Sequence, residues 1–120
     1  MRQANEKRTY DARLYDVICT GLLAPTETIS AIVSASADQG GLVFGTGVIN
    51  SQPITYYDGT VVPVGKVIQI EISGGTIGAN DSLAAGVPNL MCTVRIRFTT
   101  SLSPNQIEAT VLLLLRDQPL

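Results

Sequence analysis

The last third of the chain alternates between apolar and polar residues, and this pattern constrains the fold more than any other feature of the sequence. One side of the alternation is apolar and consists of Leu90, Cys92, Val94, Ile96 and Phe98. The other side is polar and consists of Thr93, Arg95, Arg97 and Thr99. A second apolar run, Ile107 to Leu115, follows after Ser103-Pro104-Asn105. Period two is typical of a strand with one buried face, so the two runs predict a β-hairpin.

The second arm of this hairpin is apolar on both faces. The first face contains Ile107, Ala109, Val111, Leu113 and Leu115. Leu112 and Leu114 make the opposite face apolar as well. A small antiparallel domain has one core, so we expect another protein to cover Leu112 and Leu114. The alternative is that the chain covers them itself, by a central position of the last strand or by the segment 76–88.

The composition is typical of a subunit of a larger protein assembly. Charged residues make up 15% of the 120 residues, and the net charge is −2. An average soluble protein has about 25% charged residues, and charge keeps free monomers apart in solution. The length fits one domain, which we place at residues 10–120 after an N-terminal arm at residues 1–9.

The residue inventory argues against catalysis. The chain has no histidine and only two cysteines. Ser-His-Asp and Cys-His arrangements therefore cannot form, and the usual four-ligand zinc site lacks ligands. Carboxylate pairs such as Asp11 with Asp16 or Glu71 with Glu108 remain possible, but such acids are ordinarily solvated strand residues. We expect no enzyme activity, no cofactor, no metal and no small-molecule substrate.

The start of the chain bears on its partners and on its compartment, and it predicts a protein that is intracellular when it is made. Four basic residues near the start, interrupted by two acids, are too few for a phosphate-binding stripe, so we expect no nucleic-acid partner. No apolar run of about 18 residues and no secretory signal pattern occur, which predicts no membrane partner. Cys19 and Cys92 both lie in strand-like runs, and a reducing compartment favours free thiols over a disulfide between them.

The middle of the chain contains further short strands. We expect them at 8–22, 27–36, 42–44, 54–62 and 66–73, separated by Gly, Pro and Asp. In the run 27–36 the alternation predicts Ile29, Ala31, Val33 and Ala35 on one face, with Ile32 as an exception. About seven strands with almost no helical periodicity predict an antiparallel β-sandwich or a related barrel.

Two local features have more specific predictions. Asp58-Gly59 lies between the two halves of the run 54–62 and predicts a two-residue hairpin turn, because Gly adopts positive φ without strain. Ser82-Leu83-Ala84-Ala85 is compatible with one helical turn that Asp81 caps.

Three segments resemble a known group of proteins. They are Glu27-Thr28-Ile29, the run from Lys66 to Gly75, and Cys92-Thr93-Val94-Arg95-Ile96 followed by Thr99-Thr100-Ser101. Over residues 10–115 the chain looks like the small immunoglobulin-like structural virion proteins of tailed bacteriophages. The resemblance implies an immunoglobulin-like antiparallel β-sandwich and a non-catalytic place in the virion, which is assembled in the host cytoplasm. A capsid decoration or cement subunit is the first expectation, and a tail, fibre or baseplate attachment protein is the alternative.

The expected interface combines apolar and basic residues. It consists of Arg2, Arg8, Arg95, Arg97, Leu112 and Leu114. The expected partners are other virion proteins, above all the major capsid protein, and further copies of the chain in a trimer or dimer. A different class of function, a carbohydrate- or cell-surface-binding module, would use Tyr56 and Tyr57.

Overall fold

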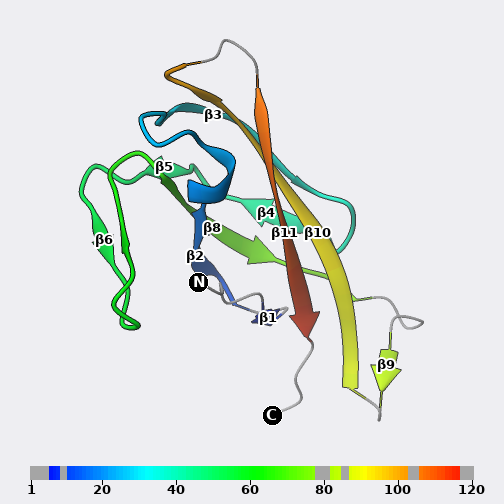
Figure 1. The fold of residues 1–120 in the computed structure, drawn as a ribbon. Helices are drawn as coiled ribbons and strands as arrows, with labels where there is room; N and C mark the ends of the chain where they lie inside the picture. Colours follow the sequence, from blue (N-terminus) through cyan, green and yellow to red (C-terminus); the bar gives the residue numbers. More distant parts are fainter. Residues whose placement is uncertain (1–5, 9–10, 78–81, 85–86, 103–105, 117–120) are drawn as a thin grey trace.

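The computed structural model describes residues 6–8, 11–77, 82–84, 87–102 and 106–116, and in these residues the chain is all-β except for one short 3-10 helix (Figure 1). The elements are β1 (Glu6–Arg8), β2 (Arg13–Ile18), η1 (Thr20–Leu22), β3 (Ile29–Ala37), β4 (Leu42–Phe44), β5 (Val48–Ile49), β6 (Ile54–Thr55), β7 (Val61–Val62), β8 (Val67–Gly74), β9 (Ser82–Ala84), β10 (Val87–Thr100) and β11 (Ile107–Arg116).

Two sheets pack face to face as a β-sandwich, as the sequence predicts. The first sheet has the strand order β1-β11-β10-β3, with β9 paired to the start of β10. The second sheet has the order β2-β8-β4, and β5 continues the edge beside β8. β6 and β7 form a separate hairpin that extends beside the second sheet (Figure 1). Except for the parallel pair β1 and β11, these strand pairs are antiparallel.

The predicted C-terminal hairpin is confirmed. β10 pairs with β11 without a register break from Asn89 opposite Arg116 to Phe98 opposite Ile107. The predicted inward face of each strand lies in the core. The buried core includes Val17, Ile68, Ile70, Ile72, Cys92, Val94, Ile96, Phe98, Ala109, Leu113 and Leu115.

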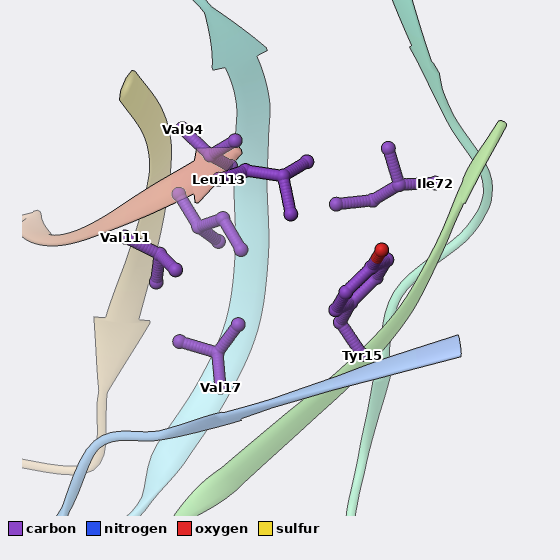
Figure 2. A pocket seen from close by; sticks show the side chains of 7 residues that line it. Tyr15, Val17, Ile72, Val94, Val111 and Leu113 are labelled. Atoms are coloured by element: carbon purple, nitrogen blue, oxygen red, sulfur yellow. The ribbon is translucent and has the colours of Figure 1, made fainter. Parts of the chain in front are cut away.

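The interior is closely packed. Figure 2 shows Tyr15, Val17 and Ile72 of the second sheet facing Val111 and Leu113 of the first around a small space. This space has a volume of about 20 Å³ and is lined almost entirely by carbon. It is room for about one water molecule, and an apolar lining offers that water no hydrogen bonds.

The prediction for the face of β3 is wrong at Ala31 and Val33, which are both exposed. Arg97 pairs with Ser34 and Phe98 pairs with Ile32, so Val33 is the extra residue of a β-bulge. A second register shift skips Ser30, between the pairs Thr99–Ala31 and Thr100–Ile29. Each bulge reverses the alternation, and Ile32 therefore packs against the core while Val33 is exposed.

Two further expectations need correction. Residues 82–84 form strand β9, where pairing with β10 replaces the expected helical turn. In the β6–β7 hairpin, Tyr56 N donates to Thr60 O and Gly59 N donates to Tyr56 O, which encloses three loop residues rather than two. Gly59 is the last of the three loop residues and has a φ of 90°. A three-residue loop ending in a left-handed glycine is the next most common hairpin after the two-residue one.

The N-terminal arm is partly integrated into the fold. β1 extends the first sheet by pairing with the end of β11, from Glu6 opposite Leu114 to Arg8 opposite Arg116. The Lys7 side chain is buried, and its ammonium contacts the Gly74 carbonyl and the Asp11 carboxylate. Residues 6–8 are thus a strand of the sandwich rather than a separate arm.

The two cysteines are buried free thiols. Burial raises the pKa of Cys19 to about 12 and also raises the pKa of Cys92. A thiol with a raised pKa is protonated at neutral pH and reacts slowly.

Candidate interaction surface

The structure brings four of the six predicted interface residues onto the outer face of the first sheet. Arg95 and Arg97 on β10 and Leu112 on β11 are exposed there, and Leu114 is partly buried. Arg8 belongs to β1 of the same sheet. Arg2 lies outside the described residues. We call this outer face of β10 and β11 the β10–β11 face.

The apolar part of the β10–β11 face lies toward the start of β10. Leu112 is 51% exposed and Met91 is 44% exposed. Met91 pairs with Leu114, and Leu112 pairs with Thr93 one step along the hairpin. Leu114 is less exposed than Leu112 because β1 pairs beside it. Met91 was not among the predicted interface residues, although alternation places it on the same face of the strand as Thr93 and Arg95.

The charged part of the β10–β11 face centres on one carboxylate. Glu108 lies across from Arg97 on the hairpin, with Oε1 3.2 Å from Arg97 Nε. Its other oxygen, Oε2, is 3.9 Å from Arg95 Nε. Two guanidinium groups therefore share one carboxylate, which leaves one net positive charge. Exposed ion pairs contribute at most about 1 kcal/mol to stability, so this cluster adds little to the fold and can form new pairs at low cost.

The outer face of β3 and the end of β10, in the same sheet, carry small polar side chains. Ser30 Oγ is 2.8 Å from Thr99 Oγ1, and Ser34 and Ser36 are exposed on β3. The β10–β11 face thus combines apolar and basic regions, and β3 adds small polar side chains beside it, as the core and the rim of a protein interface do.

The outer face of the second sheet carries a polar network that the sequence analysis did not predict. Asp16 on β2 accepts hydrogen bonds from Tyr56 Oη (2.9 Å) and from Gln69 Nε2 (3.2 Å). Burial, together with the hydrogen bond and the charge of Asp16, raises the pKa of Tyr56. This network fixes the β6–β7 hairpin against β2. Tyr57, at the tip, is fully exposed.

A buried polar network closes one end of the sandwich. Asn50 Oδ1 accepts from the backbone N–H groups of Lys66 and Val67, and Lys66 Nζ donates to Ala24 O. Glu27 accepts from the Ala24 N–H and from the Thr100 hydroxyl. These bonds satisfy backbone groups where strands end, so we assign this network a structural role.

Another hollow in the described part of the chain is an open groove between β3 and β4–β5, of about 400 Å³. It is lined by Ile32, Ser34, Ala35, Phe44, Gly45, Thr46, Gly47, Ile49 and Ile70. It contains no acidic, basic or thiol group. Among the described residues, no three His, Cys, Asp or Glu side chains gather in a way that could hold a metal ion. Within the same residues, the structure has no helix long and apolar enough to span a membrane.

Comparisons with protein-family models, with curated proteins and with solved structures gave no match to this chain.

Proposed function

We propose that this protein is a non-catalytic structural subunit of a tailed-bacteriophage virion. In this proposal it decorates the capsid and cements neighbouring shell proteins by binding them through the β10–β11 face. The observation that carries the proposal is the exposure of Leu112 beside Met91 on a strand surface bordered by Arg95 and Arg97. A lone soluble domain gains nothing from such a patch, whereas an assembly subunit buries it.

The strand order supports the immunoglobulin-like part of the proposal. β3, β10 and β11 are adjacent in one sheet, and β2, β8 and β4 are adjacent in the other. These two groups correspond to strands C, F, G and B, E, D of the immunoglobulin sandwich. Such a sandwich presents the outer face of one sheet on each side, which suits a subunit that lies on a shell.

The β10–β11 face also indicates the chemistry of its partner. Leu112 and Met91 require an apolar counterpart, because burial of apolar area is the main gain on association. Arg95 and Arg97 share a single carboxylate, so a partner carboxylate beside them forms a new ion pair without displacing Glu108. A shell surface with an apolar patch next to acidic residues fits this face.

Quantitative mass spectrometry of purified phage particles tests the proposal. We expect the chain at a fixed high copy number per capsid, and electron microscopy of the particle should place it on the outer shell. A location on the tail would favour the tail, fibre or baseplate alternative, which uses the same kind of surface. Absence from the particle would refute the virion role.

A second experiment tests the face itself. Capsids that lack the chain should release DNA at a lower temperature, and added wild-type protein should restore the release temperature. The double variant Leu112→Ser, Met91→Ser should fail to restore it. Leu14→Ser is the matched control, since Leu14 is 65% exposed on the opposite sheet. Equal restoration by both variants would exclude the β10–β11 face.

One observation favours a second candidate, a carbohydrate-binding module. The Tyr57 ring is fully exposed at the tip of the β6–β7 hairpin, where it can stack on a sugar. A glycan array with the wild type and with Tyr57→Ala separates this candidate from the first. Binding that the substitution abolishes would support it, and a blank array would remove it.

A further inference from the structure

Among the residues that the structure describes, most of β11 is an open edge of the first sheet. β1 pairs with β11 only at Leu114, Leu115 and Arg116. In the described part of the chain, no strand lies beside the seven residues from Ile107 to Leu113 on the side away from β10. An unpaired edge presents backbone N–H and C=O groups that can pair with another strand.

Within the segment 107–113, the sequence and register lack the devices that normally protect an edge strand. The segment 107–113 contains no Pro, no Lys and no Gly, and its register with β10 is unbroken. Its one charged residue, Glu108, is occupied by the two arginines of β10. The other edge of this sheet, β3, is interrupted by bulges at Ser30 and Val33, which twist an edge away from partners. The β11 edge is therefore regular, and the β3 edge is protected.

The inward side chains near this edge are incompletely covered. Ile107 and Val111 point toward the core but are only partly buried, whereas Ala109 and Leu113 are buried. A strand added beside β11 would cover both partly buried side chains. Leu112, on the outer face, would gain cover from the same strand.

We propose that two copies of this chain pair antiparallel through this edge, β11 against β11, so that one sheet continues across a dimer. The length of the open edge sets the register. Its midpoint is Thr110, so a two-fold axis there places Thr110 opposite its own copy and Ile107 opposite Leu113 of the other copy. Any shift shortens the ladder at one end of the open segment, because β1 begins beside Leu114.

A second copy fits this edge because the pairing is self-complementary. In the stated register, Val111 lies opposite Ala109 and Ile107 opposite Leu113, so apolar residues meet apolar residues on the core side. Glu108 lies opposite Leu112, and no two like charges face each other. The inference does not depend on the virion role, because the pairing is made by backbone groups along the edge of β11, although Leu112 and Glu108 also belong to the β10–β11 face.

A charge-swap experiment tests the register at its centre. Thr110 is exposed, so Thr110→Glu and Thr110→Lys should fold as the wild type does. Each variant places two like charges directly opposite one another in the dimer, which is destabilising. By light scattering coupled to size exclusion, the wild type should show twice the monomer mass and each variant the monomer mass. A one-to-one mixture should recover the doubled mass, because Glu then faces Lys.

Ser36→Glu is the matched control. Arg95 has Thr110 as its neighbour on β11 and Ser36 as its neighbour on β3. Both Glu substitutions thus add the same charge beside the same arginine, but on opposite edges of the sheet. Ser36→Glu should remain dimeric. A dimer lost equally in both variants, or a wild type that stays monomeric at its highest soluble concentration, would overturn the proposal.

Cross-linking provides a second readout. Cβ atoms directly opposite in an antiparallel pair are about 5 Å apart. Thr110→Cys should give a cross-linked dimer with a short bis-maleimide, whereas the wild type should not, since its two thiols are buried. Ser36→Cys should give only monomer. Efficient cross-linking of Ser36→Cys with none of Thr110→Cys would assign the contact to β3 instead.

Discussion

At the scale of single residues, Leu112 and Leu113 show how one position decides a side chain's role. They are neighbours in β11, yet Leu113 is 1% exposed and Leu112 is 51% exposed. We predict that Leu113→Ala lowers the free energy of unfolding by about 2–5 kcal/mol, because it leaves a cavity in the core. Leu112→Ala should cost less than about 1 kcal/mol in the monomer. Urea unfolding at low protein concentration measures both.

The unfolding measurements on Leu113→Ala and Leu112→Ala can also contradict the proposed function. Similar losses for the two substitutions would mean that the isolated chain covers both faces of β11. The apolar part of the β10–β11 face would then not be available to a partner, and the proposed function would lose its main support.

The ionisation of Glu27 makes the stability that the buried polar network provides depend on pH. The hydrogen bond from the Thr100 hydroxyl, the bond from the Ala24 N–H and the nearby Lys66 charge hold the pKa of Glu27 below its ordinary value of 4.5. A carboxylate with a depressed pKa stabilises the fold above its unfolded-state pKa, and this contribution is lost as the pH falls through the folded-state pKa.

We therefore predict that Glu27→Gln is less stable than the wild type at pH 7 and that the difference shrinks below pH 4.5. Thermal unfolding followed by circular dichroism across pH 3–7 measures this. Glu71→Gln is the control for the substitution itself, because Glu71 is exposed on the second sheet and its replacement should leave the stability at pH 7 close to that of the wild type. A difference that stays constant down to pH 3 would contradict the assigned role of the carboxylate.

Single-residue patterns predicted the core better than the surface. Period two correctly placed Val94, Ile96 and Phe98 inside, because burial of one strand face forces that alternation. The same pattern could not identify Met91 as a surface residue of interest, since its exposure depends on where the neighbouring strands end. The Asp16 network was also out of reach, because it joins residues 40 positions apart in the chain.

At the scale of elements, the β3 strand shows why an alternation can mislead. The sequence of β3 predicts Val33 on the core face, but the bulge at Val33 places Ile32 there instead. Bulges depend on how a strand pairs with its neighbour, so the sequence of one strand alone does not specify them. Pairing also explains β9. Residues 82–84 have only a weak helical propensity, and they form a strand because they pair with β10.

The β6–β7 hairpin allows a direct test of how an element is held. The Tyr56 hydroxyl donates to the Asp16 carboxylate, and hydrogen bonds to charged groups contribute about 1.5–3 kcal/mol. We predict that Tyr56→Phe lowers the exchange protection of the hairpin amides by roughly tenfold or more, while the core strands stay protected. Hydrogen exchange measured by NMR resolves the two groups of amides.

Tyr57→Phe is the control for this prediction. Tyr57 is the next residue in the same turn but is fully exposed, so loss of its hydroxyl should leave the amides unchanged. If Tyr56→Phe and Tyr57→Phe behaved alike, the hairpin would be held by its other contacts rather than by Asp16.

At the scale of the whole molecule, the composition and the fold together determine the response to pH. The chain has no histidine, so none of its side chains ordinarily titrates between pH 6 and 8. The thiols do not enter this range either, because burial raises the pKa of both cysteines above 9.0. We predict that the free energy of unfolding changes by less than about 0.5 kcal/mol between pH 6 and 8.

Above pH 9 we predict that the free energy of unfolding declines. The Cys19 thiol ionises near 9.0 in the unfolded chain but only near 12 in the sandwich. The unfolded state therefore releases a proton first, and stability falls by at most about 1.4 kcal/mol per pH unit from this group. Cys19→Ala should be less stable at pH 7 but should lose less stability between pH 9 and 10.5, as urea titrations at fixed pH would show. Parallel curves for the two proteins would mean that water reaches Cys19 in the native state, and the two sheets would then pack less tightly than the closed interior indicates.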